Sequence, residues 1–282
     1  PSGKFYASVL LDDGKPKPQT DVITKERTAG IDAGIKKALV VYYPDSTTQY
    51  FANPHVLEKQ LQAIQKLNKI LSRKHVEVSV EKDENGKERK IRHESRGYQR
   101  VKHRLALVHE KVRHIRQDYA HQITHRLANE SQVTTYVVED LNLKGMVKNH
   151  KLARALADVG IGQLYNFLAY KLEACGKNLI YADRFFPSSK RCSACGRIHQ
   201  GLTLKDREWT CVCGQQHERD ENAAINLAQY PFLEENSREG RDDPKSVKSS
   251  PRVKDVGASA LAKEVLQAEV LGSLEASAFR LG

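Results

Sequence analysis

Two closely spaced cysteine pairs place the strongest constraint on how this chain can fold. Cys192 and Cys195 form a CxxC followed by a glycine, and Cys211 and Cys213 form a CxC that is also followed by a glycine. Glycines allow the tight turns in which backbone N–H groups point at thiolate sulfurs. Two such turns on facing hairpins make a tetrahedral site of four sulfurs, which suits Zn²⁺. The pairs therefore predict a zinc ribbon.

The ligand set of this ribbon has one alternative. The second pair is one residue short of CxxC, so His217 could replace a weak fourth cysteine, and a redox pair or a chance arrangement are further readings. We expect four cysteines around a structural metal, because a closed site of four sulfurs leaves no open position for a substrate. Cys175 has no partner and is expected to be a small buried residue on a helix.

The charge balance indicates the class of partner. The chain has 282 residues and a formal net charge of +11, which favours a polyanion, and nucleic acid before a membrane. A basic but unspecialised protein is the alternative. No apolar run approaches the roughly 20 residues of a membrane span, and no signal-peptide pattern opens the chain. We therefore expect a cytoplasmic protein without a disulfide framework.

The first third of the chain predicts the opening of a sheet. Alternation predicts a strand over Phe5–Leu11, and the apolar runs Ala29–Ile35 and Lys37–Tyr43 predict two adjacent strands, with "TQYFA" as a third. The chain begins at Pro1 with its first strand already under way. We therefore expect a fragment or processed product whose natural start lies upstream.

Two long helices are predicted next. Apolar residues keep helical spacing over 57–71 and again over 101–127. The charged stretch between them contains Asn85-Gly86, which is either a hairpin tip or part of a flexible loop. Basic residues on the second helix indicate a surface that faces phosphates, with an ordinary solvated face as the alternative: Arg100, Lys102, Arg104, Lys111, Arg113 and Arg116.

Strands and helices alternate in the second half, which is typical of an α/β protein. "VTTYVVEDLNL" predicts a buried strand that ends in acids, and "NLIYAD" predicts another. Between them, one amphipathic helix is expected over 152–176, closed by Gly176. After Leu233 the composition predicts a charged, disordered tail that ends in a weak helix.

Three acids stand at the margins of the predicted core. Asp32 lies within the first strand, Glu139 at the end of "TYVVE", and Asp220 at the start of "DENAAINL". Singly, these residues could cap a turn, end a strand in solvent, or cap a helix. Together they would repel one another unless cations neutralise them, and Mg²⁺ is a hard ion that prefers carboxylate oxygens. A pair of such ions hydrolyses phosphodiesters, so the acids predict a nuclease.

Four stretches resemble a known family. "GIDAGIKKALV", "VVEDLNLKGMVKN", "DRFFPSSKRCSACG" and "WTCVCGQQHERDENAAINL" resemble, in order, the RuvC motifs and zinc ribbon of the TnpB (OrfB) family of bacterial insertion sequences. This family is related to type V CRISPR nucleases. The similarity covers roughly residues 1 to 230, and the four ordered motifs make it specific.

The resemblance implies an RNase H-like (RuvC) α/β fold with a mixed sheet, a helical insertion and an inserted zinc ribbon. It implies an RNA-guided DNA endonuclease of a transposable element in the bacterial or archaeal cytosol, associated with the nucleoid. Its partners would be a guide RNA from the transposon end and target DNA. By motif, Asp32, Glu139 and Asp220 are the catalytic carboxylates that hold Mg²⁺ or Mn²⁺, beside a structural Zn²⁺.

The resemblance also implies a domain order. It runs from a remnant of the wedge region over 1–28 to the nuclease core over 29–185 with a helical insertion at about 55–131, the ribbon over 186–217, the last motif and its helix over 218–232, and the tail over 233–282. Most of the family's N-terminal recognition region has no counterpart here. A nuclease-inactive RNA-guided regulator and a transposase proper are the alternative functions.

Overall fold

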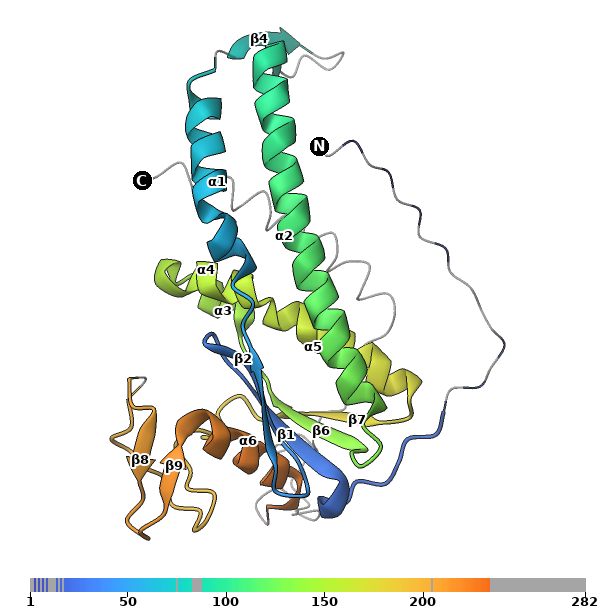
Figure 1. The fold of residues 1–282 in the computed structure, drawn as a ribbon, viewed down its shortest axis with the longest axis vertical. Helices are drawn as coiled ribbons and strands as arrows, with labels where there is room; N and C mark the ends of the chain where they lie inside the picture. The colour runs from blue at the N-terminus through green and yellow to red at the C-terminus, as the bar shows by residue number, and fades with distance from the viewer. Residues whose placement is uncertain are drawn as a thin grey trace. The chain divides into compact units, whose positions relative to one another are not determined.

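The computed structural model divides the chain into two compact units (Figure 1). The sheet unit holds Pro16–Asn53 and Ala120–Gly282, and the helical unit holds Pro54–Tyr119 together with Pro1–Lys15. The described residues are 18–74, 76–82, 88–203 and 205–233, with isolated positions before 18. The strand expected over Phe5–Leu11 is represented only by such isolated positions, and the predicted tail helix lies outside the described residues.

The sheet opens with the predicted three-strand meander. It consists of β1 (Thr28–Ala33), β2 (Lys37–Tyr42) and β3 (Thr48–Ala52), each antiparallel to the next. Buried apolar residues dominate β1 and β2, as expected of strands that are covered on both faces. The three-residue gap between β1 and β2 forces the chain to reverse at once, so the two strands pair as a hairpin.

Two further strands extend the sheet in parallel. They are β6 (Thr135–Glu139) and β7 (Asn178–Ala182), and the strand order is β3-β2-β1-β6-β7. Because β1, β6 and β7 are mutually parallel, their carboxyl ends meet at one edge of the sheet. Active sites of open α/β sheets lie at this kind of edge.

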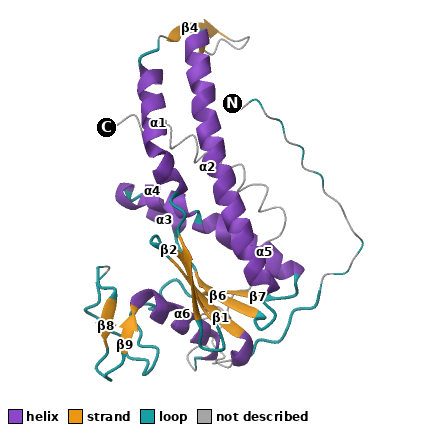
Figure 2. Ribbon diagram, viewed as in Figure 1, coloured by secondary structure: helices purple, strands orange, loops and turns teal. Residues whose placement is uncertain are grey.

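One helix packs across a face of the sheet. It is α6 (Arg219–Gln229), which is followed by η2 (Tyr230–Phe232), and Figure 2 shows it lying against the strands. Leu227 of α6 joins Val137 and Ile180 in one buried cluster. At Gly30 the approach is so close that an added Cβ would lie 2.0 Å from the carbonyl oxygen of Ala224. Glycine is therefore required at this position of β1.

The long amphipathic helix predicted over 152–176 is two helices, so that prediction was wrong. After α3 (Leu143–Val147), the chain forms α4 (His150–Val159) and α5 (Ile161–Ala174). Gly160 separates them with φ 69°, the left-handed conformation that ends a helix and that glycine adopts without steric cost.

The end of α5 confirms one expectation and corrects another. Gly176 has φ 69° and lies just beyond the helix, as predicted for a C-terminal glycine. Cys175 is the C-cap residue and is exposed, so the expectation of a buried cysteine was wrong. Cys175 follows the last turn of α5 and is not on the buried face of the helix.

The helical unit contains the two predicted helices. They are α1 (Val56–Ser72) and the first part of α2 (Arg96–Asn129), with β4 (Val76–Lys82) and β5 (Glu88–Glu94) paired antiparallel between them. Ile64 and Val112 belong to its buried cluster. The pairing favours the hairpin interpretation of the charged stretch, whose Asn85-Gly86 tip lies outside the described residues.

The basic residues expected on the second helix divide into two groups. Arg116 is partly buried, and its Nε and one terminal nitrogen are inaccessible to solvent, which contradicts its placement on an exposed face. The others are exposed: Arg100, Lys102, Arg104, Lys111 and Arg113. Within the described part of the chain, no helix is both long and apolar enough to cross a membrane.

Replacing Gly30 with alanine should destabilise the protein by about 3 kcal/mol or more, because the added methyl group meets the backbone of α6, which cannot move aside as a side chain can. Gly97→Ala is the matched control, since its Cβ would make an ordinary contact of 3.6 Å with the Lys74 side chain. Urea unfolding of both variants measures the difference. Equal stabilities would contradict the close packing of α6 on β1.

Candidate active site and zinc ribbon

Asp32 and Glu139 stand side by side at the edge where the parallel strands end. Ile31 pairs with Val138 in the parallel register of β1 and β6, and each acid is the next residue along its strand. Residues two apart on a strand face the same side, so Asp32 shares the face of Gly30, which is the face covered by α6. The sheet therefore presents both carboxylates toward α6.

Asp220 reaches this place from the first turn of α6. The helix is capped by Glu218, whose carboxylate accepts the backbone N–H of Glu221 at 3.0 Å. The alternative in which Asp220 caps the helix is therefore wrong. Since its carboxylate is not used for capping, it remains available for interactions across the site.

The three carboxylates are within electrostatic reach of one another. Burial, and then the charges of Glu139 and Asp220, raise the pKa of Asp32 well above its ordinary value, while Arg219 opposes the rise. Burial also raises the pKa of Glu139, against a hydrogen bond from Ser188 and the charge of Arg219. The structure thus brings together the three acids that the sequence singled out.

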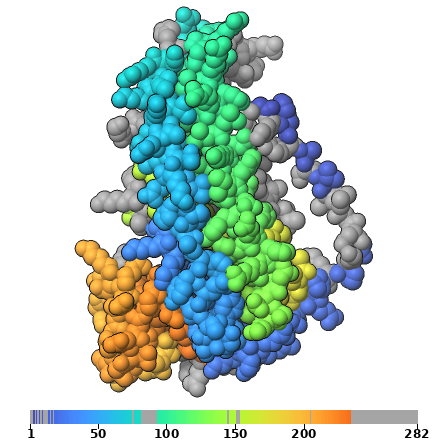
Figure 3. Space-filling view, in the orientation of Figure 1, coloured from blue at the N-terminus to red at the C-terminus, as the bar shows by residue number. Residues whose placement is uncertain are grey.

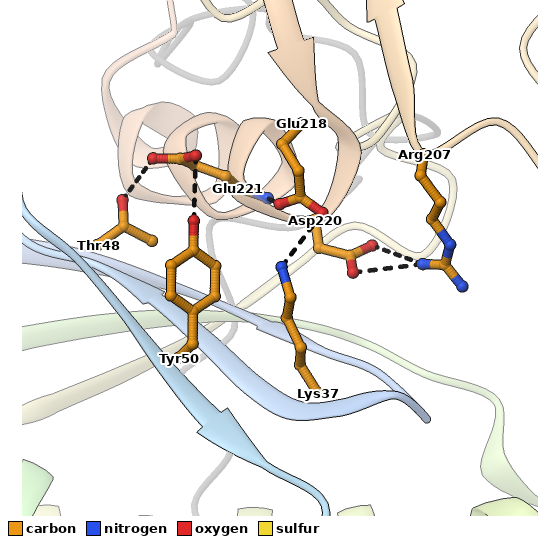
Figure 4. A network of polar contacts seen from close by, with 7 residues as sticks. All are labelled: Lys37, Thr48, Tyr50, Arg207, Glu218, Asp220 and Glu221. Atoms are coloured by element: carbon orange, nitrogen blue, oxygen red, sulfur yellow. Dashed lines mark hydrogen bonds and ion pairs between the residues drawn. The ribbon is translucent and has the colours of Figure 1, made fainter.

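Arg207 balances the charge of Asp220, a contact that the sequence analysis does not predict. One terminal nitrogen of Arg207 donates to both carboxylate oxygens of Asp220, at 3.1 and 3.3 Å (Figure 4). Among the described residues, the three acids do not form a group whose ligand oxygens all lie within 4.8 Å of one another. The sequence signal for the Arg207 contact was a basic residue between the two cysteine pairs.

A polar clamp fixes the start of α6 against the sheet (Figure 4). Glu221 accepts hydrogen bonds from Thr48 at 2.8 Å and from Tyr50 at 3.2 Å. Lys37 forms an ion pair with Glu218 at 3.2 Å and lies 4.2 Å from the centre of the Tyr50 ring. Contacts from two strands thereby fix the residues on either side of the third acid, Asp220, which projects from the turn between Glu218 and Glu221.

Ser188 holds Glu139 and belongs to the loop that enters the ribbon. Its buried hydroxyl donates to a carboxylate oxygen of Glu139. Its carbonyl oxygen accepts from the side chain of Asn226 at 2.8 Å, and Asn222 of the same helix donates to the carbonyl of Arg191 at 2.8 Å. Two buried asparagines of α6 therefore fasten the loop that contacts the second acid.

The four paired cysteines converge as the sequence predicted. The sulfurs of Cys192 and Cys213 lie 3.8 Å apart, and those of Cys195 and Cys211 lie 3.6 Å apart. A tetrahedral zinc site with Zn–S distances of 2.3 Å has sulfur–sulfur edges of about 3.8 Å, so the observed spacing fits zinc. The backbone N–H of Arg197 lowers the pKa of Cys195 to about 7, whereas burial and the neighbouring thiols raise the pKa of Cys211 to about 12, so Cys195 is the first of the two to form a thiolate that can bind metal.

The ribbon is completed by β8 (Glu208–Thr210), β9 (Gln216–Glu218) and two glycine turns. Gly196 and Gly214 have φ values of 76° and 88°, as expected of turns that follow paired cysteines. In Figure 3 the ribbon and α6, both orange, form one continuous surface beside the blue strands of the sheet. The hydrogen bonds and the ion pair of the polar clamp connect the ribbon and α6 to these strands.

His217 supports the cysteines from outside their group. Its Nε2 lies 3.1 Å from the sulfur of Cys192, but it is not among the ligand atoms that all lie within 4.8 Å of one another. Burial lowers its pKa, and its ring packs 4.5 Å from that of Trp209. A neutral histidine that hydrogen-bonds a ligand sulfur fits this geometry, and the alternative of His217 as a fourth ligand is not favoured.

Two protein families match the chain. The family described as "Probable transposase" matches residues 14–150, and the family described as "Cas12f1-like, TNB domain" matches residues 162–227. The first match includes Asp32 and Glu139, and the second includes Asp220 and all four paired cysteines. Both halves of the site therefore fall within matched sequence.

Curated relatives match over most of this chain and about half of their own length. A proposed RNA-guided DNA endonuclease of Streptomyces pristinaespiralis is 34% identical over 227 residues, which cover 80% of this chain and 50% of the relative. The CRISPR-associated endodeoxyribonuclease Cas12f1 of Sulfoacidibacillus thermotolerans is 22% identical over 226 residues, with the same two coverages. The chain spans about half the length of the curated relatives it matches.

Solved structures share the fold. A Cas12f1–sgRNA–target DNA complex matches with a TM-score of 0.51 at 18% identity, covering 76% of this chain and 52% of that chain. A CRISPR–Cas12f ternary complex matches with a TM-score of 0.54, also at 18% identity, covering 77% and 40%. These matches, with the five-stranded sheet, confirm the mixed α/β fold.

Zinc should bind in a ratio of one ion per chain, and Cys192→Ser should abolish this binding, because a buried ligand of the four-sulfur group is lost. Cys175→Ser should retain full zinc content, since that cysteine is exposed and is not a member of the group. Elemental analysis measures the metal. The single tryptophan, Trp209, is buried against the cysteines, so its fluorescence should change when a chelator removes zinc. Zinc in the Cys192→Ser variant at the wild-type level would contradict the assignment.

Asp32→Asn should stabilise the metal-free protein at neutral pH. The pKa of Asp32 is raised in the folded protein. The stability that its protonated carboxyl contributes is therefore fully present below the ordinary pKa and is lost as pH rises through the raised pKa. Each tenfold change in the acid constant corresponds to about 1.4 kcal/mol. Thermal unfolding should show a higher Tm for the variant, by a margin that grows with pH.

Added Mn²⁺ should raise the Tm of the wild type more than that of Asp32→Asn, because the ion relieves the repulsion that the amide has already removed. Asp45→Asn serves as the control, since that carboxylate lies exposed in the turn after β2 and should leave the response to Mn²⁺ unchanged. Identical Mn²⁺ shifts in the wild type and Asp32→Asn would contradict a cation site at Asp32.

Proposed function

Because this chain belongs to the TnpB family of insertion-sequence proteins, we propose that it is an RNA-guided, divalent-metal-dependent DNA endonuclease encoded by a transposable element. The observation that carries the proposal is the convergence of Asp32, Glu139 and Asp220 at one edge of the sheet, where the charges of the other two raise the pKa of Asp32. Such a cluster is costly to the fold unless it serves to bind cations.

The three carboxylates would hold Mg²⁺ or Mn²⁺, hard cations that prefer oxygen ligands. When bound, such ions activate the attacking water and stabilise the leaving oxygen in phosphodiester hydrolysis. Asp32 supplies a carboxylate that its strand fixes in place and that is partly shielded from bulk water. Ser188 orients the carboxylate of Glu139, and Arg207 and the start of α6 control the position of Asp220.

Zinc would have a structural role through the four cysteines. The ribbon contributes Arg207 to one acid, and the loop that leads into it contributes Ser188 to another. A metal that closes the two glycine turns therefore fixes two contacts to the catalytic acids. In this scheme zinc orders the site, and Mg²⁺ or Mn²⁺ at the acids takes part in the hydrolysis.

The partners we propose are a guide RNA and target DNA. The net charge of +11 and the five exposed basic residues of α2 favour polyanions. A guide supplies most of the sequence selection by base pairing, so the exposed basic residues can bind the nucleic-acid backbone without reading its sequence. Relatives named as RNA-guided DNA endonucleases support this assignment.

Asp32→Ala should reduce Mg²⁺-dependent cleavage of a plasmid target on the order of a thousandfold, which corresponds to about 4 kcal/mol of lost transition-state stabilisation. Glu139→Ala and Asp220→Ala should act similarly, whereas Asp45→Asn should cleave like the wild type. The protein is purified with its bound RNA, the RNA is sequenced, and nicking is measured in Mg²⁺, Mn²⁺ and EDTA.

Three outcomes would contradict the proposal. Cleavage that persists in Asp32→Ala would remove that residue from the site. RNA-dependent DNA binding without cleavage would indicate a nuclease-inactive regulator. Strand joining at element-end DNA without RNA would indicate a transposase proper, the activity for which one of the matching families is named.

A further inference from the structure

The segment between β7 and the zinc ribbon touches Glu139 at both of its ends. At its start, Ala182 pairs with Glu139 in the parallel register of β6 and β7. At its end, the Ser188 hydroxyl donates to the Glu139 carboxylate. Three residues of extended chain span at most about 11 Å. Phe185, three residues from each end, therefore lies close to this acid whatever path the segment takes.

The same segment is braced against the sheet unit. The Asp183 backbone N–H donates to the Tyr230 hydroxyl at 3.0 Å, and its carboxylate accepts the backbone N–H of Phe185 at 2.8 Å. The ring of Phe186 packs edge-on against Tyr230, with 4.9 Å between the ring centres. Arg184 donates to the Asp140 carboxylate at 3.1 Å. The backbone that carries Phe185 is thus fixed by its neighbours on both sides.

Phe185 itself is displayed to solvent, with 88% of its surface exposed. Its neighbour Phe186 shows that an aromatic ring can be accommodated in the adjoining core, so the exposure of Phe185 follows from the direction in which the braced backbone points it. An exposed aromatic ring forgoes the stabilisation that burial of its apolar surface would give. A fixed and exposed ring beside a catalytic centre is therefore a candidate contact for a ligand.

The surroundings of the ring favour nucleic acid over protein. Among the described residues from 183 to 191, Phe185 is the single exposed large apolar side chain, which is too little for a protein interface. Four residues beyond it, Ser189 and Lys190 begin a cavity of about 220 Å³ that Arg219 also lines. An exposed aromatic ring and cations on one short stretch of chain are typical of sites for single strands, which bind through backbone phosphates and stacked bases.

We propose that Phe185 is a stacking platform for an unpaired base of the DNA strand being cut. The inference rests on the proposed nuclease function and adds the contact that orients a single strand at the acids. Nucleotides of a strand in a duplex are about 3.4 Å apart along the axis, and those of an extended single strand are farther apart. Neighbouring strands are about 5 Å apart, so Phe185 lies within about 16 Å of the Glu139 backbone, and the stacked base lies within about five nucleotides of the scissile phosphate.

The test measures binding of a fluorescent single-stranded oligodeoxynucleotide by fluorescence anisotropy. It uses the full chain with its co-purified RNA, in an Asp32→Asn background that prevents cutting. Phe185→Ala should raise Kd by about 5- to 150-fold, the range expected for loss of one stacked base. Phe185→Trp should restore tight binding, whereas Phe185→Leu, which keeps an apolar side chain without a stacking face, should resemble Phe185→Ala. The exposed position predicts an unchanged Tm for all three variants.

A scan of single abasic nucleotides along the oligonucleotide locates the base. One or two adjacent abasic positions should weaken binding by the protein with Phe185 but not by the Phe185→Ala variant. A flat scan, equal affinities of the Phe185 and Ala variants, full binding by Phe185→Leu, or no binding of single-stranded DNA would each overturn the proposal. A larger effect with an RNA strand than with DNA would overturn the assignment to the cut strand.

Cleavage in Mg²⁺ is measured separately on protein with Asp32 intact, so the two proposals can fail independently. Absent cleavage with Phe185-dependent DNA binding would refute the endonuclease and keep the stacking site. Normal cleavage together with DNA binding that does not depend on Phe185 would support the endonuclease and refute the stacking site.

Discussion

Mutual repulsion between partly buried carboxylates is the constraint on which the rest of this structure depends. The parallel register of β1 and β6 places Asp32 and Glu139 next to each other on one face, and α6 adds Asp220. Desolvation and like charge both raise the pKa of Asp32, so the fold keeps these acids together at a cost to its own stability. A cation offsets that cost, which is why a site of this kind is more readily explained by function than by folding.

The surrounding residues manage the repulsion in different ways. Arg219 opposes the rise in the pKa of both Asp32 and Glu139, and Arg207 compensates Asp220 through two hydrogen bonds. Ser188 fixes Glu139 through a hydroxyl that is neutral at every relevant pH. These contacts come from the cysteine-bearing ribbon, its entry loop and the first residue of α6. The ribbon is therefore coupled to the acids by direct contacts, and zinc binding would strengthen them.

Local sequence patterns predicted most of the helices and strands, but they did not predict contacts between residues that are far apart in the sequence. The predicted strand that contains Asp32 is confirmed, because a short apolar run is a property of neighbouring residues. The roles of Ser188 and Arg207 depend on partners that only folding brings near, so no spacing rule indicated them. Gly160 was overlooked as a helix breaker because the apolar spacing continues across it, although its left-handed backbone ends the helix. Cys175 was wrongly expected to be buried, since a helix end was not distinguished from its interior.

Anomalous scattering from crystals soaked in Mn²⁺ tests the central claim most directly, because it locates the ion without reference to activity. The account predicts an anomalous peak coordinated by carboxylate oxygens of Asp32, Glu139 and Asp220, with Asp220 released from Arg207. A fully soaked crystal without manganese at these three residues, or with Asp220 still bound to Arg207 and manganese elsewhere, would contradict it.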